Sequence, residues 1–361
     1  MSFRHRHINY LSSVAAAVAL VLCCLFLSVR YTDLRPEALF RLHWTTASPA
    51  DPGLNRTDVK THLLTVQKAA RESYAAKWRA HTNGIASAKQ EVIVHFFQLF
   101  NASHHQGGHA HLRSVSFMEC LSLLSVLKNL QPDRTLIHTN VPDFWPFENC
   151  SDVIRNWTSV EIVPVQRKFL MNGQRFISIE HEADVMKLET LYQYGGLALD
   201  FDVYIINGAR LRETMRSFEC FMCDEKYPDL LNAGFIGCAK GSRFPKLVLE
   251  RSYQSDFRPL SWLWNSGRVP FQLAVEDPSL VEVVQDVCNI PAEDRANVLE
   301  QRGFYNWTEK MAYHTFYHNS SVTAETLRQM NSSFGDLLNW IMSDDPLPGM
   351  ETPGQGINSI E

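Results

Sequence analysis

The hydrophobic and polar positions of residues 183–208 predict a helix followed by a short strand. The helix is indicated by one apolar stripe whose members recur at spacings of three to four residues: Val185, Leu188, Leu191 and Tyr192. Gly195 and Gly196 then end the helix, because glycine tolerates the left-handed conformation that a helix C-terminus usually needs. The apolar residues 197–199 that follow are predicted to form a buried strand.

An acidic pair, Asp200 and Asp202, comes directly after this strand. In an extended chain residues two apart point the same way, so both carboxylates share one side and Phe201 points to the other. Adjacent carboxylates at the end of a buried strand repel each other and resist desolvation, and a cation normally holds them there. Their oxygen atoms suit a hard ion, Mg²⁺ or Mn²⁺, that keeps open positions for phosphate oxygens. Beyond the pair, residues 203–206 are predicted to continue as a strand into a turn at residues 207–208.

Predicted helices and strands alternate along residues 89–343, and we expect these residues to form one domain. Further strands are predicted at residues 91–100, 135–139, 160–165 and 231–239. Further helices are predicted at residues 114–130, at residues 242–251, and at residues 283–287 behind a capping box of Ser279 and Glu282. The alternation predicts an α/β fold with a mostly parallel sheet and helices on both faces. Ligands bind beyond the carboxyl ends of such strands, which is where Asp200 and Asp202 fall.

Composition narrows the class of protein only slightly. The chain has 361 residues, of which 45% are hydrophobic and 20% charged, and this is ordinary for a globular protein. Its formal net charge of −5 provides no basic field for nucleic acid, so we exclude that class of partner.

The N-terminal part of the chain carries a long apolar run at residues 8–29. The run is long enough to cross a hydrocarbon core of ~30 Å, and Arg4 and Arg6 before it favour a cytosolic N-terminus. A cleaved signal peptide is the alternative, but no small-x-small cleavage site precedes residues 28–30. We therefore expect a cytosolic tail at residues 1–7 and an uncleaved transmembrane signal anchor at residues 8–29.

Glycosylation motifs and cysteines indicate that the rest of the chain is lumenal. Seven N-x-S/T triplets follow the apolar run and none precedes it: Asn55, Asn101, Asn149, Asn156, Asn306, Asn319 and Asn331. Six cysteines also follow it, and in an oxidising compartment they predict disulfides whose pairing the sequence leaves open: Cys120, Cys150, Cys220, Cys223, Cys238 and Cys288. Cys220 and Cys223 also fit a redox or zinc motif, but no second paired site accompanies them.

The segments that flank the predicted domain have their own patterns. Residues 30–88 are expected to form a stem, because their early part is rich in Thr, Ser, Pro, Asp and Asn. Within it, residues 59–80 have a weak apolar stripe that predicts an exposed or self-associating helix. A receptor stalk would have the same features. Residues 344–361 have no apolar period and are expected to be disordered.

The motifs around the acidic pair resemble those of metal-dependent glycosyltransferases of the GT-A type. The motifs come in a fixed order: an aspartate, two further residues, a basic residue, a helix, two glycines, a strand and Asp-x-Asp. This order is similar to the DXD-containing sugar-binding region of glycosyltransferase family 32. Its relatives include α-1,4-galactosyl- and α-1,4-N-acetylglucosaminyltransferases, yeast mannosyltransferases and clostridial glucosylating toxins. The resemblance covers about residues 90–340 and is strongest over residues 183–208.

This resemblance implies a GT-A-type, Rossmann-like fold and a retaining reaction. The enzyme would move a hexose or N-acetylhexosamine from a nucleotide sugar, expected to be a UDP-sugar, to a hydroxyl of a glycan, glycolipid or glycoprotein. It would be a Golgi, single-pass type II membrane protein with a lumenal catalytic domain. No obvious carboxylate nucleophile for a double displacement is present, so the resemblance implies front-face attack.

The resemblance also implies roles for individual residues. Asp202 would bind Mn²⁺ or Mg²⁺ directly, and Asp200 would bind it through water or contact the ribose. His314, in an Ala-x-His context, would be the third metal ligand, with His318 as its alternative.

Three further residues would contact the donor. Asp184 would hydrogen-bond the hydroxyls of the donor sugar, and Asn232 would face that sugar. Lys187, where the family usually has arginine, would neutralise developing negative charge but cannot make a planar bidentate contact. An ordinary surface ion pair of Asp184 and Lys187 is the alternative interpretation.

Two other positions depart from the family pattern and allow different functions. Ala198 stands where relatives often have an aromatic residue, and Gln98 stands where they have tryptophan near the nucleotide base. With Lys187, these changes leave base and sugar specificity open, and a catalytically inactive membrane-anchored ectodomain that binds nucleotide sugars or glycans is the alternative function. A phosphatase of the haloacid dehalogenase type also has a strand that ends in Asp-x-Asp, but it usually has Thr or Val where this chain has Tyr204.

Overall fold

Seven strands form the central mixed sheet, in the order β10-β8-β9-β6-β1-β2-β3. The computed structural model describes residues 56–83, 91–101, 112–285, 287–288, 290 and 292–348. The strands of the central sheet are β1 (Ile93–Gln98), β2 (Arg134–Thr139), β3 (Val160–Pro164), β6 (Gly196–Leu199), β8 (Cys220–Asp224), β9 (Leu231–Cys238) and β10 (Glu282–Val284). Two small sheets pair β7 (Val203–Ile205) with β11 (Ala312–His314) and β4 (Leu170–Met171) with β5 (Gln174–Arg175).

The predicted mostly parallel sheet is confirmed. Strand β1 is parallel to β2 and β6, β2 is parallel to β3, and β8 is parallel to β10, whereas β9 is antiparallel to both of its neighbours. The chain passes from β1 to β2 to β3 in one direction, and β6 then lies on the other side of β1. This reversal of strand order makes a topological switch point, beyond which α/β proteins bind their ligands.

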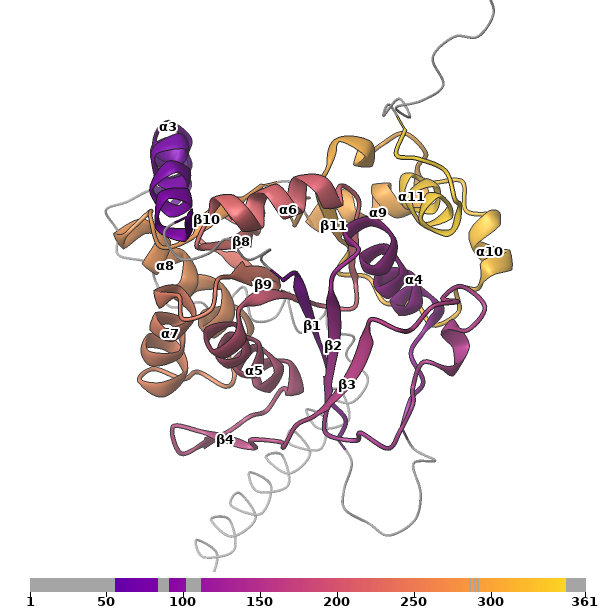
Figure 1. Ribbon diagram of the computed structural model, residues 1–361, viewed down its shortest axis with the longest axis horizontal. Coiled ribbons are helices and arrows are strands. Elements are labelled where there is room, and N and C mark those ends of the chain that lie inside the picture. The colour runs from indigo at the N-terminus through magenta and orange to yellow at the C-terminus, as the bar shows by residue number, and fades with distance from the viewer. Residues whose placement is uncertain are drawn as a thin grey trace, which may run out of the picture. The chain divides into compact units, whose positions relative to one another are not determined.

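Helices cover both faces of the sheet, as the sequence predicts. They are α3 (Arg56–Asn83), α4 (Phe117–Ser125), α5 (Ile179–Tyr194), α6 (Gly208–Ser217), α7 (Arg243–Val248), α8 (Val269–Glu276), α9 (Ala292–Glu300), α10 (Ala324–Arg328) and α11 (Ser333–Met342). Three π-helical turns, η1 (Val126–Leu130), η3 (Leu249–Gln254) and η4 (Trp264–Arg268), and two 3₁₀ turns, η2 (Glu148–Cys150) and η5 (Trp307–Glu309), complete the described elements. Figure 1 shows α5 and α7 on one side of β1–β3 and α4 on the other.

Strand β6 separates two buried cores. Leu197 and Leu199 pack in one core with residues of α4, including Cys120 and Leu123. Ala198, on the opposite face, packs in a second core with residues of α5 and α7. Successive side chains of a strand alternate between the two faces of the sheet, and the residues after Leu199 keep this alternation. The two aspartates of the acidic pair therefore lie on the same face.

Two local predictions are wrong. The predicted turn at residues 207–208 is the start of α6, where the Asn207 side chain accepts a hydrogen bond from the Arg210 amide (2.9 Å) and so caps the helix. The predicted capping box does not form, because Ser279 instead donates to Asp277 Oδ1 (2.6 Å). Residues Glu282–Val284 form a strand paired with β8, in keeping with the preference of β-branched valines for sheets.

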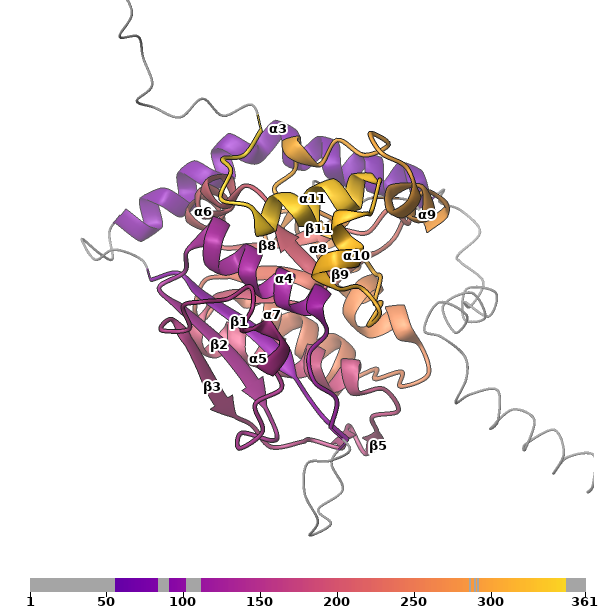
Figure 2. The same cartoon turned by 90° about the vertical axis from the view of Figure 1, so that its right-hand side faces the viewer.

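Segments outside the predicted domain also pack on it. The predicted helix at residues 59–80 is confirmed by α3, which contacts α6, α8 and β10. Figure 2 shows α3 passing beside α6. Contrary to the expectation of an exposed or self-associating helix, its stripe of Lys60, Leu63 and Gln67 is buried. At the other end of the chain the Trp340 indole donates to Pro346 O (3.1 Å), so residues 344–348, which have no regular secondary structure, contact the folded domain. The rest of that tail, residues 349–361, lies outside the described residues.

The predicted membrane segment is not part of the described structure. Residues 1–7 and 8–29 lie outside the described residues. Within the described ranges, no helix combines the length and the apolar character that crossing a membrane requires.

The predicted disulfides are confirmed, and the structure gives their pairing. They are Cys120–Cys150, Cys220–Cys238 and Cys223–Cys288. Cys220 and Cys223 are thus bonded to different partners and do not form a CxxC redox pair.

Candidate active site

The acidic pair lies in a tight turn at the carboxyl end of β6. The Asp200 amide donates to Gly234 O in β9 (2.9 Å), and the Val203 amide donates to Asp200 O (3.1 Å). Asp202 is buried, whereas the Asp200 side chain is 40% exposed. Phe201 points into the core and stacks on Phe96, with ring centroids 4.5 Å apart. The prediction that the two carboxylates share one side is therefore confirmed.

His314 reaches the pair through the small sheet of β7 and β11. Pairing of these strands places His314 opposite Val203, and the Thr315 amide donates to Asp202 O (3.1 Å). His314 Nε2 lies 3.1 Å from Asp202 Oδ1. One ligand atom from each of Asp200, Asp202 and His314 lies within 4.8 Å of the others. The structure thus brings together the three residues predicted as metal ligands.

His318, the alternative ligand, also faces Asp202 but from the surface. Its Nε2 lies 3.7 Å from Asp202 Oδ2, and its side chain is 64% exposed. His314 is the better placed of the two, because it is closer and buried.

Asp202 and His314 stabilise each other's charged forms. Burial opposes ionisation of Asp202, but the charge and the hydrogen bond of His314 outweigh it and lower the pKa of Asp202 to about 2. Burial likewise opposes protonation of His314, and the carboxylate of Asp202 nevertheless raises the pKa of His314.

Two carboxylates and an imidazole are a donor set that Mn²⁺ or Mg²⁺ fits, so these residues suit the divalent ion that the sequence predicts.

Lys187 links the helix to the acidic pair. Its Nζ donates to Asp184 Oδ1 (3.0 Å), one turn earlier in α5, and to Asp200 Oδ1 (2.6 Å). It also donates to Ala233 O (3.3 Å). Burial opposes its charge, but Asp200 and Asp184 together raise the pKa of Lys187. Since Lys187 and Asp184 are both buried, they are not the surface ion pair of the alternative interpretation.

Asn232 and Gly234 in β9 lie beside the acidic pair. Asn232 Oδ1 accepts from the Gly234 amide (2.7 Å), and its Nδ2 donates to Glu225 Oε2 (2.9 Å). A Cβ atom on Gly234 would lie 2.5 Å from His314 Cε1 and 2.7 Å from Asp200 Oδ2. Only glycine fits at this position, because every other side chain would displace these two residues.

A second layer behind His314 was not predicted from the sequence. Glu225 is buried, its carboxylate pairs with Arg295 (2.9 Å), and burial raises the pKa of Glu225 despite that partner. The Arg295 guanidinium lies over the ring of Phe316 (3.8 Å), which stacks on the imidazole of His314 (3.8 Å). Phe316 has a positive φ of 54°, a conformation that non-glycine residues rarely adopt and that is often kept at functional sites. The only sequence signal was the run of aromatic residues in positions 311–319.

The two positions that depart from the family pattern lie in different surroundings. Gln98 is buried at the carboxyl end of β1, the strand beside β6. Ala198 packs in the second core with residues of α5, such as Val185 and Leu188.

Comparisons with known proteins show only low similarity. No family model matches the chain, and no curated protein matches it. It is similar to the galactosyltransferase LgtC, solved in complex with donor and acceptor sugar analogs, with 13% identity, a TM-score of 0.40, and coverage of 70% of this chain and 95% of that one. It is also similar to the glycosyltransferase GlyE of Streptococcus pneumoniae TIGR4, with 10% identity, a TM-score of 0.38, and coverage of 71% of this chain and 61% of that one.

A structure with a different activity is equally similar. The inositol-1-phosphate CTP transferase from T. maritima has 11% identity and a TM-score of 0.36, with coverage of 71% of this chain and 99% of that one. Similarities at this level do not define a function, so we infer the function from the geometry of the site.

Proposed function

We propose that this protein is a metal-dependent glycosyltransferase that moves a hexose or N-acetylhexosamine from a UDP-sugar to a hydroxyl of a glycan, glycolipid or glycoprotein. The observation that carries the proposal is the convergence of Asp200, Asp202 and His314 within 4.8 Å of one another at the carboxyl end of β6. This end belongs to the topological switch point between β1 and β6, where α/β folds bind ligands. Membership of glycosyltransferase family 32 and retention of configuration are proposed from the sequence motifs.

The protein's own residues divide into metal ligands and groups that orient the donor. Asp202 and His314 would hold Mn²⁺ or Mg²⁺, and Asp200 would bind it through water or contact the ribose. When bound, this ion would supply positive charge to the diphosphate and to the leaving group. The acceptor hydroxyl would attack from the same face and give its proton to the departing phosphate.

Asp184, Lys187 and Asn232 would act on the donor sugar. Lys187 fixes the direction of the Asp184 side chain, since its Nζ donates to Asp184 Oδ1 (3.0 Å) and both residues are buried. Asp184 could then accept hydrogen bonds from the sugar's hydroxyls. Asn232 lies beside Gly234, and its side chain is held by Glu225 and the Gly234 amide.

We also propose that the chain is a single-pass type II Golgi membrane protein with residues 89–343 in the lumen. Exposure of sequon asparagines supports this, because oligosaccharides are attached only to accessible side chains: Asn101, Asn149, Asn156, Asn306 and Asn331 are exposed. Removal of N-linked glycans from the protein made in animal cells should increase its gel mobility in several steps. A single unglycosylated species would contradict a lumenal location.

A binding module without catalysis is the second candidate function. The observation that favours it is the 2.6 Å contact between Lys187 Nζ and Asp200 Oδ1, because a permanent cation already neutralises one carboxylate of the pair. Such a protein would bind a nucleotide sugar without turnover.

Binding of Mn²⁺ to matched variants tests the proposed metal site. In Asp202→Asn the affinity for Mn²⁺ should fall more than about tenfold, since a charged ligand is lost, and circular dichroism should show that the variant is still folded at the assay temperature. His318→Gln should stay within about twofold of the wild type, because His318 is the exposed, more distant histidine. Unchanged Mn²⁺ affinity in folded Asp202→Asn would refute the metal assignment.

A further inference from the structure

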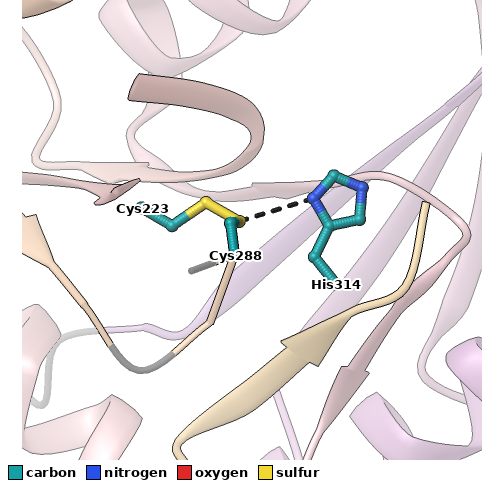
Figure 3. Close-up of side chains that lie close together, drawn as sticks. All are labelled: Cys223, Cys288 and His314. Carbon is teal, nitrogen blue, oxygen red and sulfur yellow. Dashed lines mark hydrogen bonds between the residues drawn. A yellow bond between two sulfur atoms is a disulfide. The ribbon is translucent and has the colours of Figure 1, made fainter. Parts of the chain in front are cut away.

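The second ring nitrogen of His314 faces sulfur. Figure 3 shows His314 Nδ1 directed at Cys288 Sγ, 3.4 Å away, within the disulfide that joins Cys288 to Cys223. Its first ring nitrogen, Nε2, faces Asp202. His314 therefore belongs to two groups whose ligand atoms lie within 4.8 Å: one with Asp200 and Asp202, the other with Cys223 and Cys288.

The backbone holds the two cysteines and the histidine together independently of the sulfur–sulfur bond. Cys223 lies in β8 opposite Val284 of the parallel strand β10, and its Cα atom is 5.9 Å from that of Cys288. The His314 amide donates to Val287 O (3.1 Å), the residue before Cys288. Cys223, Cys288 and His314 are all buried. Reduction of the disulfide would leave these backbone contacts in place.

We propose that the reduced chain contains a zinc site made of the Cys223 and Cys288 thiolates and His314 Nδ1, with water as the fourth ligand. Two thiolates and an imidazole are a donor set that Zn²⁺ prefers over Mg²⁺ or Mn²⁺. The two thiolates also neutralise the charge of the ion, which lowers the cost of burying it. This site does not depend on the proposed transferase activity, because it uses different ligand atoms.

Oxidation of Cys223 and Cys288 removes the zinc site and frees His314 for the site at Asp200 and Asp202. Each thiolate gives up one electron to a small-molecule disulfide such as oxidised glutathione, so the Cys223–Cys288 bond forms, the small disulfide splits into two thiolates, and Zn²⁺ is released. A neutral imidazole has only one free lone pair, so His314 serves one ion at a time. The oxidation state of one cysteine pair thus decides whether His314 binds a soft ion or remains available beside Asp202 for a hard ion.

Cobalt, which absorbs light when bound by thiolates, tests the site in the full chain. The chain reduced with a phosphine and given Co²⁺ should develop thiolate-to-cobalt absorption in the near ultraviolet, and Zn²⁺ should abolish it. Oxidised glutathione should also abolish it and release the ion. If reduction unfolds the chain, Zn²⁺ should restore its folded circular dichroism spectrum.

Variants separate this site from the transferase site. Cys288→Ser should lose the absorption. Asp202→Asn should keep it while losing affinity for Mn²⁺, so failure of either site is seen separately. Absorption that persists in Cys288→Ser, or a reduced wild-type chain that neither absorbs with Co²⁺ nor refolds with Zn²⁺, would overturn the proposal.

Discussion

Gly234 is the single residue whose size most directly limits the geometry of the site. A Cβ atom there would meet His314 Cε1 at 2.5 Å, Asp200 Oδ2 at 2.7 Å and Asn232 Oδ1 at 2.9 Å, all closer than real contacts allow. Its backbone also accepts the hydrogen bond that fixes the Asp200 amide. Gly234 thus lets β9 approach the acidic pair closely enough to complete the site.

Gly234→Ala should lower Mn²⁺-dependent turnover by about ten- to a hundredfold, because misplacing catalytic groups by about 1 Å has an effect of this size. Initial rates at saturating donor measure it. Gly303→Ala is the control for backbone strain alone: Gly303 has a positive φ of 73°, unlike Gly234, but nothing lies within 4 Å of the added Cβ atom, so turnover should not change. Equal turnover in both variants would mean that the site tolerates displacement of His314 and Asp200.

Lys187 is the second residue on which the site depends. It is buried between Asp184 and Asp200, and it is the only cation for which the described residues show a bond to either. Lys187→Met would leave Asp184 buried without this partner, and the free energy of unfolding should fall by about 3–5 kcal/mol. Lys187→Arg keeps the charge, so it should retain more stability and activity than Lys187→Met. Denaturant unfolding of both variants measures this, and a fully stable Lys187→Met would contradict it.

At the scale of elements, a pair of buried histidines supports the turn from α5 into β6. His95 in β1 contacts His138 in β2, with 3.0 Å between Nδ1 and Nε2, and its other nitrogen lies 2.9 Å from Gly195 O. A Cβ atom on Gly196 would lie 2.6 Å from Ile93 O, so β6 can approach β1 only with glycine there. Burial lowers the pKa of His95 to about 4 despite the hydrogen bond to Gly195, and burial, with His95 nearby, lowers the pKa of His138 to about 3.

These pKa values predict a loss of stability in mild acid. The unfolded chain takes up protons on His95 below its ordinary pKa of 6.5, whereas the folded chain keeps it neutral down to about 4. Its stabilisation is therefore complete above pH 6.5 and is lost as the pH falls toward 4, with about 2 kcal/mol lost at pH 5 from His95 alone. Denaturant unfolding at pH 7.5 and 5.0 measures this loss.

Two histidine variants check the source of that pH dependence. His95→Gln should show a smaller difference in unfolding free energy between the two pH values. His62→Gln, on the exposed surface of α3, should behave as the wild type. The same pH dependence in His95→Gln and wild type would show that other groups cause it.

Helices and strands whose sequence pattern lies within the element itself could be predicted from the sequence. Elements whose secondary structure depends on contacts with residues far away in the sequence could not. The α5–β6–β7 unit was predicted because its stripe, its two glycines and its apolar residues all lie within residues 183–206. Strand β10 was predicted as a helix because Ser279 and Glu282 have capping-box spacing. In the structure Glu282 pairs instead with Arg71 of α3, far away in sequence, through a 2.8 Å bond to its Nε.

The candidate site shows the same division. Asp200 and Asp202 are close in sequence and follow a strand, so their shared side was predictable. His314 could be assigned only by resemblance, because it reaches them through pairing of β7 and β11. Glu225 and Arg295 could not be predicted at all, since only the tertiary fold brings them together behind Asn232 and Phe316.

At the scale of the whole molecule, α3 is part of the folded unit. The described residues from 56 to 348 belong to one compact unit, although residues 30–88 were predicted to be a stem. Lys60 pairs with buried Asp224, and Gln67 Nε2 donates to Val281 O (2.7 Å). Arg71 pairs with buried Glu282.

A chain that begins at residue 89 should therefore be less stable than one that begins at residue 54. Loss of α3 would leave Asp224 and Glu282 without their cations, and the thermal midpoint should fall by about 5–10 °C. Thermal unfolding of the two chains measures this. Equal midpoints for the chains that begin at 54 and 89 would mean that α3 is a dispensable stem.

The proposed transferase activity is best tested by release of nucleotide from a panel of UDP-sugars by the purified full chain, with and without Mn²⁺. Metal-dependent glycosyltransferases transfer sugar slowly to water when no acceptor is present. We expect Mn²⁺-dependent release of UDP from one sugar of the panel, and loss of that release in Asp202→Asn. No release from any UDP-sugar, together with no Mn²⁺-dependent shift in thermal unfolding, would contradict it and favour the binding module.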